Sequence, residues 1–104
     1  MRRVIRWEEA ASLDLAVIGQ YLSKNFGVRV ASKWIAKIIS STNTLATFPN
    51  IGHIYQHNPS YRVLTVKRSN IYYRINEKEI VIVAVFDNRR DDKTIKDYLK
   101  EKNK

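Results

Sequence analysis

The run IVIVAVF at residues 80–86 constrains the fold more than any other part of the chain. Odd and even positions are equally apolar, so a strand formed by this run needs a place inside a sheet with cover on its faces. Seven residues are too few to cross a bilayer as a helix, which takes about 20 residues. We therefore predict a central strand of a sheet that helices cover on at least one side.

Helical periodicity in the first half of the chain supplies that cover. Apolar residues recur at spacings of four and three, as on one face of an α-helix: Ala11, Leu15, Ile18 and Leu22. Glu8 and Glu9 suit the first turn, where the helix dipole favours acids, and Gly27 suits the stop. The pattern predicts a helix over residues 8–25.

A second apolar stripe follows at once along the chain. Its members are again three or four residues apart: Ala31, Ile35, Ile38, Thr42 and Leu45. The helix is expected to end near Thr47, because Pro49 and Gly52 in FPNIG cannot continue it. Two helices joined by a short connection favour an antiparallel helical hairpin.

The second half changes to the alternation of β-strands. The tail favours one or two amphipathic helical turns around Ile95, Tyr98 and Leu99, and residues 2–7 are predicted to form an edge strand. The predicted fold class is α+β, in one domain of residues 1–104 with the order β-α-α-β-β-β and the hairpin packed on a small twisted antiparallel sheet. The strands of its meander are predicted at residues 61–68, 71–75 and 80–86, with turns at 69–70 and 76–79.

The charge of the chain is strongly basic and unevenly distributed. The net charge is +9, which indicates a polyanionic partner such as nucleic acid, a membrane surface or an acidic protein. All ten acids lie in the first 14 residues or from Glu77 onward, so residues 15–76 carry cations alone. This middle segment is predicted to form a functional basic surface; the alternative is a charge that serves only solubility.

The composition excludes several kinds of site. The 104-residue chain has no cysteine, so it forms neither a disulfide nor a thiolate metal site, and a reducing cytoplasm is the expected setting. His53 and His57 are four residues apart, but Pro49 and Pro59 disfavour the helix on which such a pair would bind a metal. Neither a metal nor a cofactor is expected, and the short apolar runs predict a soluble protein.

The charged segment DNRRDD follows the apolar run directly, and Arg89 and Arg90 stand side by side in it. One interpretation is a local ion pair of Arg89 with Asp87 or Asp91 at a solvated strand end. The other is an anion site for a phosphate, because the guanidinium fork binds two phosphate oxygens at once.

Several segments, in this order and spacing, resemble the RelE/ParE superfamily of bacterial toxins. They are DLAVIGQYL in the first helix, LATFPNIG at the exit of the second, YRVLTV and IYYRI in the meander, and IVIVAVFDNRRDD at the sheet end. The resemblance covers nearly the whole chain. It implies a toxin of a type II toxin–antitoxin pair, which is held inactive by an antitoxin protein encoded beside it. The lack of acids in residues 15–76 predicts that this antitoxin is acidic.

The superfamily combines two activities with one fold. RelE-like members cut messenger RNA in the ribosomal A site, and ParE-like members poison DNA gyrase without cutting RNA. In the RNA-cleaving branch, cations on the sheet bind the RNA backbone, and an arginine after the last strand stabilises the transition state. Arg89 resembles that arginine, and Arg62 resembles a basic position found in both branches.

Two positions depart from the RelE pattern. Its paired lysines would fall around Tyr61 and Val63, and its catalytic tyrosine would fall at Ile95, three residues before Tyr98. Either His53 or His57 could replace the missing lysine or tyrosine, because histidine titrates near neutrality; the alternative is that both are loop histidines exposed to solvent. These departures favour the ParE-like branch.

The resemblance and the residues together define a candidate site. Aromatic residues that alternate with cations can stack on unpaired bases, although they are also good strand formers. The first functional hypothesis is a ribosome-dependent mRNA endonuclease, in which the 2′-hydroxyl of the RNA attacks the adjacent phosphate without a metal. The alternative is a non-enzymatic inhibitor of DNA gyrase, and a third possibility is a basic nucleic-acid-binding domain without toxicity. The candidate catalytic residues are Arg62, Arg89, His53 and Tyr98, and the candidate nucleic-acid-binding residues are Lys67, Arg68, Arg74, Arg90, Tyr61 and Tyr73.

Overall fold

The computed structural model describes residues 2–90 and 92–102, and its elements confirm the α+β class and the predicted order. Two features go beyond the prediction, a short extra strand (β2) and the length of the last helix (α3). In the part of the chain described, no helix is long and apolar enough to cross a membrane. The elements are β1 (Val4–Trp7), α1 (Glu9–Phe26), α2 (Val28–Asn43), the 3-10 turn η1 (Thr44–Ala46), β2 (His53–Ile54), β3 (Arg62–Val66), β4 (Ser69–Ile75), β5 (Glu79–Asp87) and α3 (Asp92–Lys102).

The strands form one sheet in the order β1-β5-β4-β3-β2. β5 is an inner strand, as its apolar run predicts, and β1 lies at an edge. The predicted antiparallel sheet needs one correction, because β1 runs parallel to β5, with Val4 opposite Glu79 and Trp7 opposite Ile82. The hairpin and the rest of the meander lie between these two strands in the chain, and a parallel pair needs such a long crossover connection.

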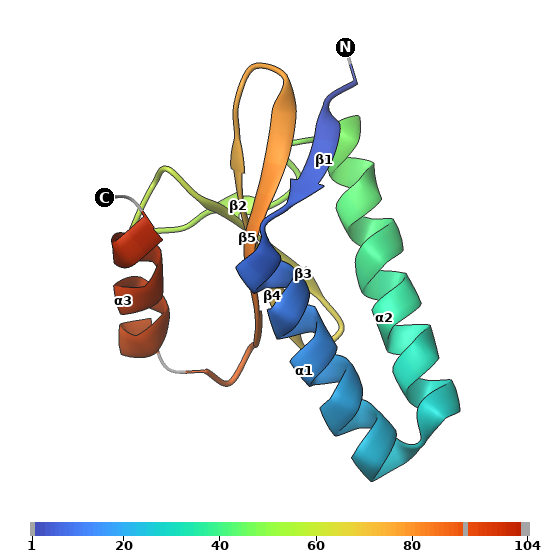
Figure 1. The fold of residues 1–104 in the computed structure, drawn as a ribbon. Coiled ribbons are helices and arrows are strands. Elements are labelled where there is room, and N and C mark those ends of the chain that lie inside the picture. The colour runs from blue at the N-terminus through green and yellow to red at the C-terminus, as the bar shows by residue number, and fades with distance from the viewer. Residues whose placement is uncertain (1, 91, 103–104) are drawn as a thin grey trace.

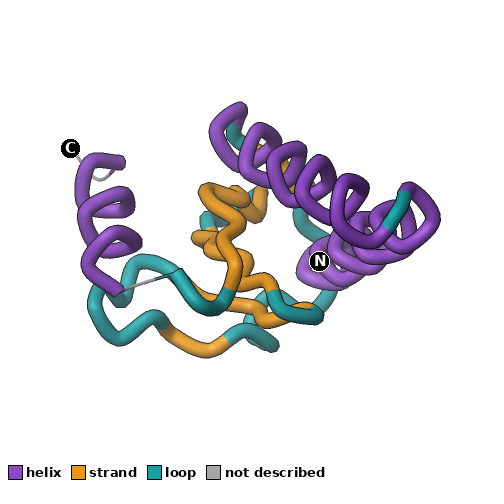
Figure 2. The backbone as a smooth tube through the Cα atoms, turned by 90° about the horizontal axis from the view of Figure 1, so that it is seen from below, coloured by secondary structure: helices purple, strands orange, loops and turns teal. Residues whose placement is uncertain are grey.

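Helices cover both faces of this sheet (Figure 1). The α1–α2 hairpin packs on one face and α3 on the other, as Figure 2 shows. Residues 80–86 of β5 are all buried between the two helical layers. The double cover is the physical reason why this strand is apolar at odd and even positions alike.

A β-bulge in β5 shifts the alternation of its side chains between the two faces. Tyr72 of β4 pairs with Ala84, but Tyr73 pairs with Ile82, which leaves Val83 as an extra residue. Val83 and Ala84 consequently both belong to the core cluster on the α3 side. The hairpin side resumes only after them, at Val85.

The helical hairpin follows the predicted stripes closely. α1 spans residues 9–26 instead of the predicted 8–25, and its cap Gly27 has a backbone φ of 93°, in the left-handed region that favours glycine. Ile38 and Leu45, which belong to the second predicted stripe, are completely buried against the sheet. The hairpin therefore presents its apolar stripes to β5 and its neighbours.

The turn between β3 and β4 lies two residues earlier than predicted. Lys67 and Arg68 form it, and Lys67 has a φ of 58°, in the left-handed region. Ser69, predicted as a turn residue, instead pairs with Asp87 and is buried. The longer β4 gains a ladder partner at its first residue, and the turn becomes a two-residue loop of the length that hairpins favour.

The C-terminal helix α3 has 11 residues, longer than the predicted one or two turns. Ile95 and Leu99, four residues apart, are buried against the sheet, with Tyr98 packed beside them. Tertiary packing of an apolar face stabilises a helix that would be marginal alone. Packing of these few apolar residues on the sheet thus stabilises a helix that is longer than the stripe itself.

Candidate functional site

The charged segment after β5 lies beside the β3–β4 turn at one end of the sheet. Ser69 pairs with Asp87, and the Asn88 backbone N–H donates to the Arg68 carbonyl at 2.8 Å. These contacts bring cations from two separate turns together. We call them the basic sheet end; its members are Lys67, Arg68, Arg89 and Arg90, and all four are exposed.

Asp87 orients Arg89 within the basic sheet end. The Arg89 guanidinium donates to the Asp87 carboxylate through Nε at 3.1 Å and Nη2 at 3.4 Å, and the Arg89 backbone N–H donates at 2.8 Å. The guanidinium hydrogen bond lowers the pKa of Asp87, and the charge of Arg68 acts in the same direction. The predicted ion pair with Asp87 is present, while Asp91 lies outside the described residues.

The ion pair does not withdraw Arg89 from solvent, because 66% of its side chain remains exposed. The pKa of Arg89 is raised mainly by the hydrogen bond to Asp87, and the Tyr21 hydroxyl of α1 contributes in the same direction. Arg90 turns elsewhere, with its guanidinium 5.0 Å from the centre of the Phe86 ring. The two neighbouring arginines thus have different partners, and both remain accessible to an anion.

Arg62 lies at the start of β3 and holds a loop in place. Its Nη1 donates to the Gly52 carbonyl at 2.7 Å and to the Asn50 carbonyl at 3.4 Å. The buried Tyr73 hydroxyl fastens the same loop, since it donates to the Pro49 carbonyl at 2.6 Å and accepts from the Gly52 N–H at 3.0 Å. Burial raises the pKa of this hydroxyl. These contacts of Arg62 and Tyr73 hold the loop of residues 49–52 against the sheet and therefore have a structural role.

The predicted catalytic residues fall in separate parts of the sheet. His53 is exposed on β2 at the sheet edge, where it pairs with Val63 and so lies one register position from Arg62, while Arg89 lies at the other end of the strands. Tyr98 is half-buried on α3, where its ring packs edge-on against Phe86 at 5.3 Å and its hydroxyl donates to the Val83 carbonyl at 3.4 Å. Asp87 of β5 is level with Val66 of β3 in the strand ladder, and Arg62 lies four residues before Val66. The offset along the strands is about 14 Å. The four candidate catalytic residues therefore do not surround one point.

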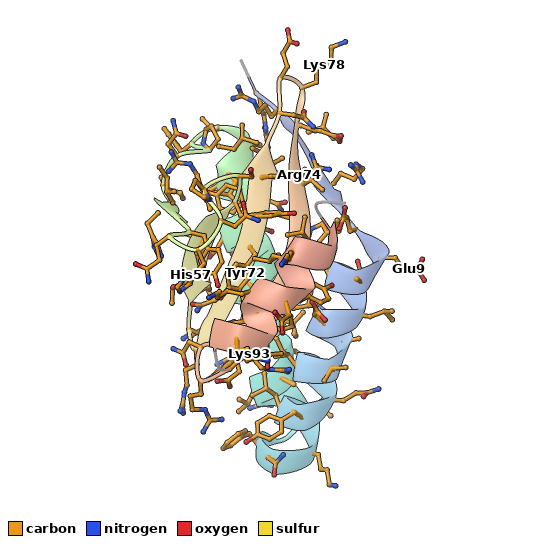
Figure 3. All side chains as sticks on the ribbon, turned by 90° about the vertical axis from the view of Figure 1, so that its left-hand side faces the viewer. Glu9, His57, Tyr72, Arg74, Lys78 and Lys93 are labelled. Atoms are coloured by element: carbon orange, nitrogen blue, oxygen red, sulfur yellow. The ribbon has the colours of Figure 1, made fainter. Side chains whose placement is uncertain are left out.

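Two of the predicted base-stacking residues are core residues. Tyr61 and Tyr73 are buried, so the prediction that they stack on bases is corrected: neither ring reaches the surface. Both faces of the sheet are covered, and the aromatic residues of its strands fill the core. Arg74 is half-buried on the α3 side of β4, and Figure 3 shows it on the same face as Tyr72.

A groove lies between the hairpin and the basic sheet end. Its volume is about 960 Å³. One wall is apolar and comes from α1 and α2, with Val17, Tyr21, Phe26 and Trp34 along it. The other wall contains three cations of the basic sheet end, Arg68, Arg89 and Arg90. We call this feature the hairpin groove; Figure 1 shows the tip of the hairpin extending past the β3–β4 turn.

The apolar wall of the hairpin groove was not predicted, because its residues do not belong to the helix stripes that pack on the core. Val17 and Tyr21 are 63% and 52% exposed, and Phe26 is 59% exposed. A signal exists, because Leu13, Val17 and Tyr21 form a second apolar stripe at spacings of four. That stripe lies apart from the one that packs on the sheet, and a surplus apolar stripe on a helix indicates a partner.

The described residues contain no group of three or more histidine, aspartate or glutamate side chains placed to hold a metal ion. The chemistry that the basic sheet end offers is electrostatic. Exposed guanidinium groups bind carboxylates or phosphates, and an adjacent apolar wall gives such binding shape and area.

Comparisons with known proteins identify the family. The family described as ParE toxin of type II toxin-antitoxin system, parDE, matches residues 5–92. The chain is 33% identical over 90 residues to Toxin ParE3 of Caulobacter vibrioides, which covers 86% of this chain and 89% of that protein.

Two solved structures share the fold. The chromosomal ParDE system of P. aeruginosa contains a chain with a TM-score of 0.75 and 22% identity, covering 83% of this chain and 96% of that one. A conserved hypothetical protein of Helicobacter pylori has a TM-score of 0.55 and 13% identity, over 86% and 98% of the two chains. Residues 5–92 contain the hairpin, the sheet apart from Val4, and all four members of the basic sheet end, so the match spans the features described above. The chain belongs to the ParE toxin family of type II toxin–antitoxin systems, within the RelE/ParE superfamily.

Proposed function

We propose that this protein is the toxin of a type II toxin–antitoxin pair and that it inhibits DNA gyrase by binding, without cutting RNA. Family membership supports the toxin role, and within the superfamily the ParE-like branch is the one that poisons gyrase. A cognate antitoxin protein is accordingly the expected partner, and gyrase the expected target.

The observation that carries the choice of binding over cleavage is the dispersal of the candidate catalytic residues. A metal-free ribonuclease needs its proton-transfer groups and its charge-stabilising arginine around one phosphate. Arg62 is engaged with the Gly52 carbonyl, and Tyr98 packs on the α3 side of the sheet. The mRNA-cleavage hypothesis loses its main support, and the alternative stated at the outset fits the family better.

The basic sheet end is the surface that we expect to contact the target. Lys67, Arg68, Arg89 and Arg90 project from two adjoining turns, and Asp87 orients one of them, Arg89. Gyrase acts on DNA, and clustered arginines suit the phosphate groups of DNA as well as acidic protein surfaces. This assignment retains part of the predicted nucleic-acid-binding set and gives Arg89 a binding role.

A supercoiling assay with purified gyrase tests the proposal. We expect the parent protein to inhibit supercoiling of a plasmid, and the double variant Arg68→Ala/Arg89→Ala to need a higher concentration by a factor on the order of ten. The matched control is Lys33→Ala/Lys37→Ala, which removes two exposed cations from α2, outside the hairpin groove. It is expected to inhibit like the parent.

Primer extension on cellular mRNA after brief induction separates the two activities. Growth arrest without cuts inside codons, together with inhibited supercoiling, agrees with the proposal. Cuts within codons and unaffected gyrase would reverse it in favour of mRNA cleavage. Equal loss of inhibition in both double variants would mean that net charge matters and the basic sheet end does not.

A further inference from the structure

We propose that the hairpin groove binds single-stranded DNA, with unpaired bases stacked on the exposed aromatic rings of α1 and backbone phosphates held by the arginines of the basic sheet end. The inference deepens the proposed function and rests on it for the choice of DNA as the nucleic acid, because gyrase acts on DNA. It rests on the groove itself for the location and the chemistry of the contact.

The apolar wall of the groove presents aromatic rings to solvent. Tyr21 and Phe26 of α1 are both more than half exposed, and their ring centres lie 6.4 Å apart with an angle of 68° between the ring planes. Trp34 lines the same wall from α2 and is half-buried. Accessible rings stack on bases of any sequence, because every base has a π-face. These side chains therefore offer the stacking that the buried Tyr61 and Tyr73 do not provide.

The opposite wall supplies the charge for phosphates. Arg68, Arg89 and Arg90 line it, and all three are exposed. A guanidinium group binds two phosphate oxygens at once and keeps its charge at any physiological pH. The combination of arginines on one wall with aromatic rings on the other matches the two parts of a nucleotide.

The two acids that line the groove already have partners within the fold. The Asp14 carboxylate accepts a hydrogen bond from the Val85 backbone N–H at 3.1 Å, and Asp87 accepts from Arg89. The groove thus has three arginines against two aspartates, and neither aspartate is placed on the aromatic wall. An anion that enters the groove meets an excess of cations.

The rings and the guanidinium groups adjoin one another at Tyr21. The pKa of Arg89 is raised mainly by the hydrogen bond to Asp87 and also by a hydrogen bond with the Tyr21 hydroxyl. The aromatic wall therefore meets the cationic wall at this pair of residues. A strand that stacks a base on Tyr21 brings the phosphate of the same nucleotide close to Arg89.

The occupant is an unpaired strand because stacking needs a free base face. In a duplex each base stacks on its neighbours, so a duplex meets the arginines through its phosphates but offers no base to the rings. The groove has a volume of about 960 Å³ and follows α1 from Asp14 to Phe26, which is about 18 Å of helix. This length accommodates a few unstacked nucleotides.

Two identical substitutions test the stacking. Phe26→Ala removes a ring of the groove, whereas Phe48→Ala removes a ring that is 61% exposed in the loop after η1 and does not line the groove. The probe is a fluorescein-labelled oligothymidylate of about 12 nucleotides, and its dissociation constant is measured by fluorescence anisotropy at about 50 mM salt. The same strand paired with its complement is the duplex control, and an oligouridylate of equal length is the RNA control.

We expect the single strand to bind at least about tenfold more tightly than the duplex. Phe26→Ala should raise its dissociation constant about tenfold and Phe48→Ala less than about twofold. Thermal melts check that both variants fold, and Tyr21→Ala is a second variant of the same wall. Equal affinity for single strand and duplex, or equal effects of the two phenylalanine substitutions, would overturn the proposal. Tighter binding of the oligouridylate would overturn the choice of DNA.

The phosphate contacts are tested by the salt dependence of binding. Arg89→Ala and Arg29→Ala both remove an exposed arginine, but Arg29 lies on α2 and does not line the groove. Each phosphate contact contributes about 0.7 to the slope of log K against log salt concentration for a single strand. We expect Arg89→Ala to reduce the slope by about this amount and Arg29→Ala to leave it unchanged. A slope that Arg89→Ala does not change would remove Arg89 from the site.

The supercoiling assay separates this inference from the proposed function. If the parent inhibits gyrase but binds no oligonucleotide, the DNA site is wrong and the proposed function stands, with an acidic protein surface as the ligand of the arginines. If the parent binds the single strand in a Phe26-dependent way but leaves supercoiling unaffected, the DNA site stands and the proposed function fails.

Discussion

Arg62→Ala is predicted to destabilise the fold, because the Arg62 guanidinium holds the loop before β2. The substitution removes the donors to the Gly52 and Asn50 carbonyls. The Gly52 carbonyl then loses a charge-assisted hydrogen bond within a loop that also depends on the Tyr73 hydroxyl. The substitution is therefore expected to lower the stability of the folded protein, and any change in activity would follow from that loss.

The magnitude follows from the geometry of the two contacts. A hydrogen bond that involves a charged group contributes about 1.5–3 kcal/mol to stability. The bond to Gly52 is short at 2.7 Å, whereas the bond to Asn50 at 3.4 Å is close to the limit for a hydrogen bond, so we count only the first. Arg62 is half-buried, which favours the lower value of about 1.5 kcal/mol. For a domain of this size, that loss lowers the melting temperature by roughly 6–12 °C.

Thermal unfolding followed by circular dichroism measures the effect. Tyr73→Phe is the comparison, because it leaves the half-buried Pro49 carbonyl and the buried Gly52 N–H without their partner and is expected to cost about 1–3 kcal/mol. Since Arg62 and Tyr73 hold the same loop, the double variant should lose less than the sum of the two single losses. If Arg62→Ala melts within about 2 °C of the parent and no longer inhibits gyrase, Arg62 is a functional residue and the reasoning is refuted.

Three further predictions follow from individual contacts. Gly52→Ala should lower stability by about 1–3 kcal/mol in urea titrations, because its Cβ would lie 2.6 Å from the Tyr73 hydroxyl oxygen; unchanged stability would mean that the loop moves freely. Asp87 has a lowered pKa in the folded protein, so its contribution to stability is present above the ordinary aspartate pKa of about 3.9 and is lost as the pH falls through the lowered value. Asp87→Asn should therefore reduce the stability difference between pH 6 and lower pH, on the order of pH 3, in thermal melts, and an unchanged difference would exclude this carboxylate. Arg89→Ala should melt like the parent yet inhibit gyrase less than Arg90→Ala does, since Arg90 also packs on Phe86; full inhibition by Arg89→Ala would remove it from the target surface.

The local pattern of residues was sufficient for the elements and their order. Helical spacing located α1 to within a residue at each end, because an amphipathic helix repeats its apolar face every three or four positions. The second helix was expected to end near Thr47, but α2 ends at Asn43 and the 3-10 turn η1 follows it. The uninterrupted run at residues 80–86 identified the strand that is buried on both faces. Both predictions depend on how often apolar side chains recur along the chain, which is a property of neighbouring residues. The family resemblance rests on the same segments in the same order.

The candidate site was predicted only in part. Arg89 and Arg90 lie just beyond the end of β5, as the sequence predicts. The ion pair of Arg89 with Asp87 joins residues two apart in the sequence, so it too could be predicted. The approach of Lys67 and Arg68 depends on the pairing of β4 with β5, which brings the two turns together. The apolar wall of the hairpin groove had a sequence signal, but only the packed fold shows which helix stripe is left over.

Tertiary structure decided the remaining features, because they depend on partners far apart in the chain. Tyr72 and Tyr73 are adjacent and point to opposite faces, and both are buried because helices cover both sides of the sheet. Alternation alone assigns residues to two faces and does not say which face is solvated. Arg62 donates to a loop ten residues earlier, and the parallel pairing of β1 with β5 joins residues more than 70 positions apart. Sequence period determined what each segment became, and long-range packing determined which of its side chains remained free to bind.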